Sequence, residues 1–386
     1  MRILFISRNS SHAKYYRTLV SNLNLDAQLH VTGLPRWGAI KQLGQLSQFK
    51  HNEILENHLL RKKARHPKLF ASNFVCNVFK AYLAVFESLR FLKFIDLLKA
   101  EQPDKVVVWN GKKLPNQTVV SAAECLSIPV MFFENGLVPN TTCLDPKGVN
   151  YLSSLPRTPD FYMQRELTGA SLAAIEQAKS HKNRVADTPT ESLPENYIFV
   201  PFQVPNDTQV VVHSPWIKSM EMLFEEVMKA VDALQNPNLK VVFKEHPNWP
   251  HKFTQLHQAH PKAVFANSVK ASDLIKNAQA TITINSTVGL ETLQLGGKLI
   301  TLGNACYALP EMVLSASSPV ELQEQLEKIA AWQPNTVLIE RFLDYVNGVY
   351  AIPQAWRRVD QRHIESVEKR LLEQDEFSVE LTHQTA

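Results

Sequence analysis

Two short segments in the second half of the chain combine residue types that bind anions. In the run from Ile284 to Glu291, Ser286 and Thr287 follow a strand-like stretch and open a helix-like one. Backbone N–H groups at a helix start, with two hydroxyls beside them, suit a phosphate. Here Gly289 is expected to let the phosphate approach, and Glu291 to accept ribose hydroxyls. The alternative is an ordinary serine cap of a helix.

The second segment is Lys244-Glu245-His246-Pro247, at the end of another strand-like run. Pro247 disfavours helix at the residue before it and holds His246 extended. A histidine in that position can donate to a phosphate, and Lys244 adds positive charge. Gln203, in the turn after a third strand, is a further candidate for contact with a nucleotide.

Carboxylates for catalysis are expected in the first half of the chain. Glu134 follows the apolar run Ile128–Phe133 and precedes the turn at Gly136. Asp145 comes shortly afterwards and is the second candidate. A carboxylate at a strand end can act as a nucleophile or stabilise positive charge, whereas its structural alternative is to brace the turn.

The elements that must position these residues alternate between strand and helix. Short apolar runs alternate with helical periodicity, which predicts parallel sheets with helical crossovers. The strands are expected at 2–7, 28–32, 105–109, 128–133, 197–201, 240–244, 263–265, 280–285 and 298–302. Residues 40–100 are expected to be mostly helical, with a further helix at 169–180 and a linker at 187–195.

This alternation predicts an α/β fold of the GT-B type, with two Rossmann-like domains facing a central cleft. The N-terminal domain is expected at 1–190 and the C-terminal domain, including the terminal helices, at 191–386. A length of 386 residues fits two cores better than one.

Charge is unevenly distributed along the chain. The formal net charge is +4, but Arg36–Lys93 holds eleven Lys and Arg against three Glu. The basic stretch Arg61–Lys68 directly precedes an apolar run, Phe74–Leu98, and indicates an anionic partner. That partner is a phospholipid surface, a phosphorylated acceptor or a nucleic acid, and the sequence has no nucleic-acid reader motif. An ordinary solvated face is the alternative. The sequence has neither a signal peptide pattern nor an apolar run long enough to span a membrane, and its four cysteines lack metal-ligand spacing.

Taken in order, these segments resemble the bacterial capsule polysaccharide synthesis family, most closely its KpsS- and KpsC-like members. The resemblance is carried by Glu134-Asn-Gly, Asp145-Pro-Lys-Gly-Val-Asn150, Ser153-Ser-Leu-Pro-Arg157, Asp160-Phe-Tyr162, Gln203-x-Pro205, His246-Pro247, Ser286-Thr287 and Gly289. It covers about residues 100–310. The chain departs from the family at Asn135, where members often have a second acidic residue, and at Leu137, where a basic residue follows their Gly turn.

The resemblance implies a retaining glycosyltransferase that moves Kdo from CMP-Kdo to a lipid or oligosaccharide acceptor. His246, Ser286 and Thr287 would hold the CMP phosphate, with Gln203 near the nucleotide. No Asp-x-Asp motif occurs, so neither a metal nor another cofactor is expected. The alternatives are another donor, such as CMP-sialic acid or a UDP-sugar, and a non-catalytic nucleotide-binding protein of capsule assembly. The implied location is cytoplasmic and peripheral on the inner membrane, with capsule export or assembly proteins as further partners.

Overall fold

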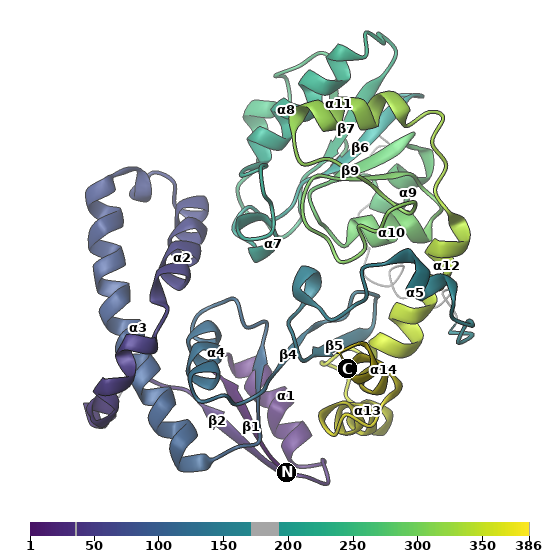
Figure 1. Cartoon of the computed structure of the whole chain (residues 1–386). Coiled ribbons are helices and arrows are strands. Elements are labelled where there is room, and N and C mark those ends of the chain that lie inside the picture. The colour runs from purple at the N-terminus through teal and green to yellow at the C-terminus, as the bar shows by residue number, and fades with distance from the viewer. Residues whose placement is uncertain (35–36, 171–192, 386) are drawn as a thin grey trace. The chain divides into compact units, whose positions relative to one another are not determined.

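The chain folds as two compact α/β units in a computed structural model that describes residues 1–34, 37–170 and 193–385 (Figure 1). Unit 1 comprises Met1–Leu155 together with Val349–Ala386, and unit 2 comprises Pro156–Gly348. Each unit holds one six-stranded, largely parallel sheet. The predicted α/β class with two Rossmann-like halves is therefore confirmed.

The sheet of unit 1 has four parallel strands and two antiparallel strands at one edge. In sheet order the strands are β12 (Ile352–Pro353), β5 (Thr141–Asp145), β4 (Val130–Asn135), β3 (Lys105–Trp109), β1 (Arg2–Ser7) and β2 (Asp26–Val31). β5 runs antiparallel to β4, and β12 antiparallel to β5. β3 and most of β1 are buried apolar runs, as expected for central parallel strands.

Helices cover this sheet and extend away from it. They are α1 (Ser10–Val20), η1 (Trp37–Gln48), α2 (His51–Arg65), η2 (Leu69–Ala71), α3 (Asn73–Glu101), α4 (Asn116–Cys125), η3 (Asn150–Leu152), α13 (Gln361–Leu371) and α14 (Glu376–Thr385). Figure 1 shows α2 and α3 side by side, standing away from the strands of unit 1. Among the described residues, no helix has both the length and the apolar content needed to span a bilayer.

The last part of the chain belongs to unit 1, whereas the sequence analysis placed it in the second domain. β12 pairs with β5, so that Ile352 lies opposite Thr142. The Arg370 side chain is fully buried and donates to the carbonyls of Leu144, Val349 and Tyr350. The units also divide at Leu155 rather than at residue 190. The pairing of β12 with β5 explains the place of the terminal segment, because strand pairing over such a distance leaves no local pattern in the sequence.

The sheet of unit 2 is entirely parallel. In sheet order its strands are β11 (Leu314–Ser315), β10 (Leu299–Thr301), β9 (Ala280–Thr283), β6 (Tyr197–Pro201), β7 (Lys240–Lys244) and β8 (Ala263–Phe265). Its helices are α5 (Pro159–Met163), α7 (Thr208–Val211), α8 (Met220–Ala233), η4 (Thr254–Leu256), α9 (Ala271–Asn277), α10 (Val288–Gln294), α11 (Pro319–Lys328) and α12 (Thr336–Tyr345). A π-helical turn, η5 (Val346–Tyr350), follows α12.

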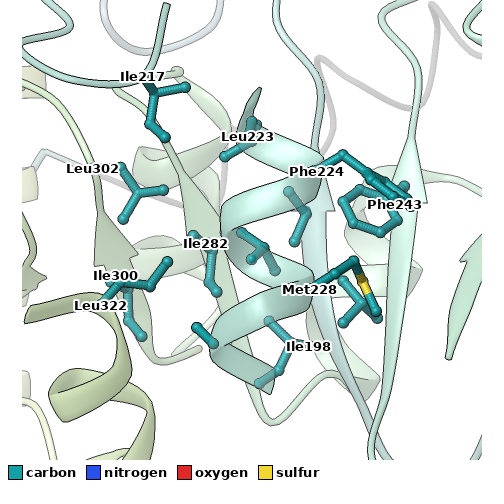
Figure 2. Close-up of a cluster of buried hydrophobic side chains, with 14 of the residues drawn as sticks. Ile198, Ile217, Leu223, Phe224, Met228, Phe243, Ile282, Ile300, Leu302 and Leu322 are labelled. Carbon is teal, nitrogen blue, oxygen red and sulfur yellow. The ribbon is translucent and has the colours of Figure 1, made fainter. Parts of the chain in front are cut away.

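The core of unit 2 lies between this sheet and α8 and α11 (Figure 2). Leu223 and Met228 of α8 face strand residues such as Ile198 and Ile282, and all of these side chains are buried. This packing fixes the central strands, and the loops at the carboxyl edge of the sheet begin at their ends. The predicted helix at 169–180 and linker at 187–195 lie mostly outside the described residues.

Candidate functional site

The strand order of unit 2 creates a switch point between β6 and β9. From β6 the chain continues to β7 on one side, and it later returns to place β9 on the other side. In open parallel sheets, ligands bind at the carboxyl ends of the strands where the winding direction reverses. The loops that begin after Pro201 and Thr283 flank this point, and the loop after Lys244 is next to it. Three of the predicted motifs therefore start at neighbouring strand ends.

Gln203 ties the two strands at the switch point together. Its Nε2 donates to Asn285 Oδ1 at 3.0 Å, and its Oε1 accepts from the backbone N–H of Asn285 at 3.1 Å and from Thr283 Oγ1 at 3.3 Å. Asn285 in turn donates to the carbonyl of Gln209 at 2.9 Å. Because Gln203 is buried and both ends of its amide are engaged, it serves to position the loops rather than to read a base.

Ser286 and Thr287 form the turn that leads into α10. The N–H of Ser286 donates to Thr283 Oγ1 at 3.3 Å, and its Oγ accepts from the N–H of Val288 at 3.2 Å. Thr287 is exposed, and Ser286 is half-buried. The residue at the N-cap of α10 is Thr287, and its side chain makes no capping hydrogen bond, so the serine cap of the alternative is not formed. The Ser286 hydroxyl instead bonds the first residue of the helix, which holds this turn at the carboxyl edge. Glu291 lies in the first turn of α10 and is half-buried.

Gly289 is required by a side chain of the protein itself. A Cβ atom built at Gly289 would lie 2.5 Å from the Tyr307 hydroxyl oxygen. That hydroxyl donates to the carbonyl of Ser286, and burial raises the pKa of Tyr307 well above its usual value. Close packing of Tyr307 accounts for the glycine, whereas the expected approach of a phosphate stays a prediction. Tyr307 was not predicted, because nothing in its sequence neighbourhood links it to this turn.

His246 is held as a neutral donor at the end of β7. Its Nδ1 accepts from the N–H of Asn248 at 3.2 Å, so the proton of the neutral ring is on Nε2. Burial lowers the pKa of His246, and the nearby charge of Asp207 partly opposes this. Lys244 donates to the carbonyl of Asn267 at 2.6 Å, which holds its charge against the neighbouring loop. His246 can therefore donate through Nε2 at neutral pH.

Glu245, between these two residues, is a structural carboxylate. It is buried, and it accepts from the N–H of Phe253 at 2.8 Å and contacts His257 and Lys252. Burial alone would raise the pKa of Glu245, but these hydrogen bonds and the charge of Lys252 outweigh burial and lower it. The loop that carries His246 is thus fixed by the bond from Lys244 to Asn267 and by the contacts of Glu245 with Phe253 and its neighbours.

Glu134 lies at the carboxyl end of β4 in unit 1. Its Oε2 accepts from Asn110 Nδ2 at 2.6 Å, and its Oε1 accepts from the N–H and the Nδ2 of Asn135, both at 3.0 Å. Trp356 fixes Asn135 in turn, because its Nε1 donates to Asn135 Oδ1 at 2.9 Å. Glu134 is half-buried, so neighbouring amides orient its carboxylate without enclosing it.

Asp145 lies at the end of β5 and is completely buried. Its oxygens accept from the N–H groups of Lys147 (2.8 Å), Gly148 (3.1 Å) and Ser154 (2.7 Å), and from the hydroxyls of Ser154 (2.9 Å) and Tyr350 (3.1 Å). These bonds occupy both oxygens and organise the loop that follows β5. The geometry therefore favours Glu134 over Asp145 as a reacting carboxylate.

Unit 1 has a switch point of its own, between β1 and β3. The loops that follow these strands enclose a cavity of about 350 Å³. Its wall includes Arg8, His12, Asn110 and Lys113, none of which was assigned to a site from the sequence. The signal was present only as a polar loop after one strand and an Asn-Gly pair after another.

Comparison with known proteins gives three findings. A family model described as capsule polysaccharide biosynthesis protein matches residues 166–317. Protein FixF of Sinorhizobium fredii is 35% identical over 302 residues, which cover 78% of this chain and 73% of FixF. The capsule polysaccharide export protein KpsS of Escherichia coli is 23% identical, with coverage of 59% of this chain and 74% of KpsS.

Among solved structures, the KpsC β-Kdo 2,7-transferase of Thermosulfurimonas dismutans is similar to this chain, and the match covers 72% of this chain and 89% of the KpsC chain. The identity is 19% and the TM-score 0.44. The UDP-GlcNAc 2-epimerase of Neisseria meningitidis, bound to UDP-GlcNAc, covers 96% of this chain at 14% identity with a TM-score of 0.40.

Proposed function

Since the chain belongs to the capsule polysaccharide biosynthesis family, we propose that it is a glycosyltransferase of surface polysaccharide synthesis. The donor is a nucleotide-activated sugar, specifically CMP-Kdo, and the acceptor is a lipid or saccharide. Transfer occurs with retention of configuration at the anomeric carbon.

One observation carries the donor site: three polar loops begin at adjacent strand ends around the switch point of unit 2. In this proposal the Nε2–H of His246 and the hydroxyls of Ser286 and Thr287 hold the CMP phosphate, and Lys244 adds positive charge. Gln203 keeps the loops in register through its bonds to Asn285. Glu291, one turn into α10, faces the ribose.

The chemical step assigns Glu134 as the nucleophile. Its carboxylate oxygen forms a bond to the anomeric carbon as the bond from that carbon to the phosphate oxygen breaks, and the electron pair leaves with CMP. His246 and the two hydroxyls stabilise the negative charge that develops on the phosphate. The acceptor hydroxyl then attacks the same carbon, loses its proton and releases Glu134. Two displacements at one carbon retain its configuration.

Nucleotide binding tests the donor site. His246→Ala is expected to weaken CMP binding by about 1.5–3 kcal/mol, as for loss of a hydrogen bond to a charged group. Isothermal titration calorimetry with CMP, UDP and GDP measures this change and identifies the base. The matched control is His251→Ala, because His251 is an exposed histidine of the following loop. Equal CMP affinity in the two variants would remove His246 from the site.

Product analysis tests the transfer itself. The protein is incubated with CMP-Kdo and a panel of lipid and oligosaccharide acceptors, and mass spectrometry follows the mass of one added Kdo. A product with CMP-sialic acid or a UDP-sugar instead would keep the enzyme class and change the donor. Nucleotide binding without any product from any donor would favour the non-catalytic capsule-assembly protein.

We propose an anionic membrane surface as a further partner. Four apolar side chains of α3 are exposed at helical spacing on one face: Phe74 (76%), Val78 (53%), Tyr82 (60%) and Val85 (64%). The basic residues Arg61, Lys62, Lys63, Arg65 and Lys68 lie just before this helix, at the end of α2 and in the loop after it. An apolar helix face beside a basic cluster matches a bilayer with anionic headgroups. This assignment implies a cytoplasmic protein, peripheral on the inner membrane.

A further inference from the structure

The cavity of unit 1 lies at the carboxyl edge of a parallel sheet, between the two strands where the winding direction reverses. Its volume is about 350 Å³, which is within the usual range for small-molecule sites. The lining comprises Ser7, Arg8, Asn9, His12, Trp109, Asn110, Lys113, Leu114, Pro115 and Asn116. Ser7 and Trp109 are the last residues of β1 and β3, and the others come from the loops after these strands and from the starts of the helices that follow.

Hydrogen bonds fix this lining in place before any ligand arrives. Asn9 caps α1, because its side chain accepts from the N–H groups of Ser11 and His12. On the other side, Asn110 and Gly111 both have positive φ angles, +65° and +74°. A Cβ atom at Gly111 would lie 2.4 Å from the Phe132 ring. The Asn-Gly pair is therefore required for the sharp turn that carries the chain from β3 into the cavity wall.

The cavity carries positive charge and no acid in its lining. Arg8 and Lys113 line it, while Glu and Asp are absent from the lining residues. Arg357 is a third cation close to the cavity. Burial is the main cause that lowers the pKa of His12 to about 4, and the charges of Arg357 and Lys113 lower it further. His12 is therefore neutral at pH 7, and the charge of the lining is that of Arg8 and Lys113. A pocket of this kind favours an anionic group.

One wall of the cavity is aromatic. The His12 ring stacks on Trp109, with 4.1 Å between ring centroids and an interplanar angle of 18°. Trp356 meets His12 edge-on at 5.2 Å, and the Arg357 guanidinium lies over the Trp356 ring at 4.7 Å. A flat aromatic surface beside cations suits a sugar ring that carries a negative group. A nucleobase would also stack, but the lining amides are already engaged: the Nδ2 groups of Asn110 and Asn116 donate to Glu134 and to the Trp109 carbonyl, and Asn9 Oδ1 caps α1.

The cavity is coupled to the carboxylate of Glu134 through one residue. Asn110 lines the cavity, and its Nδ2 donates to Glu134 Oε2 at 2.6 Å. A ligand held by Arg8 and Lys113 therefore lies one amide away from the side chain assigned to catalysis. We propose that this cavity binds an anionic saccharide through its carboxylate or phosphate group, and that this saccharide is the acceptor. The identification as acceptor rests on the proposed function, whereas the binding of an anionic saccharide does not.

A matched set of ligands tests the chemistry of the cavity. Glucose, glucuronate and glucose 6-phosphate share a ring and differ in charge. Calorimetry is expected to show binding of one or both anionic sugars, weakened by added salt, and none of glucose. The relative affinity for glucuronate and glucose 6-phosphate distinguishes a carboxylate from a phosphate. Glucose binding as tightly as both anionic sugars would overturn the proposal.

Variants locate the binding. The double variant Arg8→Gln and Lys113→Gln is expected to lose about tenfold or more in affinity for the anionic sugar. Lys14→Gln, at an exposed lysine of α1 outside the cavity, is expected to change nothing. Equal losses, or no loss in the double variant, would contradict the assignment.

A measurement on the unaltered chain covers the case in which the double variant does not fold. A bound anion is expected to raise the low pKa of His12, which imidazole NMR detects, with His12→Asn identifying the signal. An unchanged His12 titration at saturating glucuronate and glucose 6-phosphate would place the binding elsewhere.

The failure of this proposal can be separated from failure of the proposed function. CMP affinity is expected to be unchanged in the Arg8 and Lys113 variant, and anionic-sugar affinity to be unchanged in His246→Ala. In the transfer reaction, the double variant is expected to raise the acceptor KM at saturating donor and to leave the donor KM unchanged. Sugar binding without transfer would leave a saccharide site in place and remove only its identification as the acceptor site.

Discussion

At the scale of single residues, hydrogen bonding separates two carboxylates that the sequence offers as candidates. Glu134 is the last residue but one of β4 and Asp145 the last residue of β5, and a turn with a glycine follows each strand. Asp145 accepts five hydrogen bonds from its own loop and from Tyr350, while Glu134 is oriented by two asparagines and is half-buried. The sequence pattern already ranks Glu134 first, but the hydrogen bonds that separate the two carboxylates include partners distant in the chain, such as Asn110 and Tyr350, which the sequence does not reveal.

Paired amide substitutions test this distinction. Glu134→Gln is expected to keep the fold and to reduce turnover about a thousandfold or more, because the nucleophilic charge is lost. Asp145→Asn is expected to lower the melting temperature, because one of its oxygens becomes a donor that faces other donors. Product formation and thermal unfolding are measured for both variants. Turnover of Glu134→Gln within tenfold of the unaltered protein would exclude a nucleophilic function.

The pH dependence of stability reports on His12. Its pKa is about 4 in the folded protein, against an ordinary value of 6.5. As the pH falls below about 6.5, the unfolded chain takes up a proton that the folded ring does not, so stability decreases until about pH 4, where the loss is complete. The ring is half-exposed, so the loss is smaller than about 1.4 kcal/mol per pKa unit.

Replacing His12 removes this contribution. The free energy of unfolding of His12→Asn is expected to fall less steeply between pH 6.5 and 4 than that of the unaltered protein, with a constant offset above pH 7. His58, whose pKa is also lowered to about 4, keeps its own contribution in both proteins. Urea titrations across this range give the two curves, and parallel curves would contradict the expected effect of His12.

At the scale of elements, periodicity located α3 but could not show which parts of it are buried. The apolar positions form one stripe in the sequence, yet Phe74, Val78, Tyr82 and Val85 are exposed, while Leu92 and Ile95 are buried. The first half of α3 packs against α2 through other residues, among them Cys76. The predicted parallel strands were found within a few residues of their expected bounds. β5, β11 and β12 were not predicted. β5 follows β4 through a short turn, whereas β11 and β12 have only two residues each, and β12 pairs with a segment far earlier in the chain.

Arg370 tests how firmly α13 is held to unit 1. Arg370→Gln removes the guanidinium that donates to the carbonyls of Leu144, Val349 and Tyr350 and that pairs with the carboxylate of Asp375. Breaking a buried charged cluster of this kind costs about 3–5 kcal/mol, which chemical denaturation measures. The neighbouring Lys369 is exposed, so Lys369→Gln is the control and is expected to stay within about 0.5 kcal/mol. Similar small losses in both variants would show that α13 is held by other contacts.

At the scale of the whole molecule, the chain separates its chemistry between two units. The motifs proposed to bind the nucleotide all lie in unit 2, while Glu134, the cationic cavity and the basic cluster before α3 lie in unit 1. Residue order could predict this division, since each group of motifs follows its own set of strands. It could not predict that the terminal segment returns to the first unit.

Liposome flotation tests the membrane surface of unit 1. Binding to vesicles with phosphatidylglycerol is expected at low salt and to decrease at about 1 M salt, where screening shortens to roughly 3 Å. Each Lys or Arg near such a surface contributes about 1 kcal/mol, so replacing Arg61, Lys62, Lys63 and Arg65 with Gln is expected to abolish flotation. Phe74→Gln with Tyr82→Gln tests the apolar face, and Lys328→Gln with Lys276→Gln, in unit 2, is the control. Binding that ignores lipid charge and salt would leave the cluster an ordinary solvated face.

The return of Val349–Ala386 to unit 1 has a consequence for the order of synthesis. Ile352, Ile364 and Leu371 pack in one core with Ile3 and Phe5, although the whole of unit 2 lies between them in the chain. During translation, the first strands of unit 1 are therefore synthesised early, and their apolar face stays uncovered until 349–386 has been made. All residues of unit 2 are synthesised before that segment. The unit that is made first is therefore completed after unit 2, and a premature stop within 349–386 damages the core that contains Ile3 and Phe5.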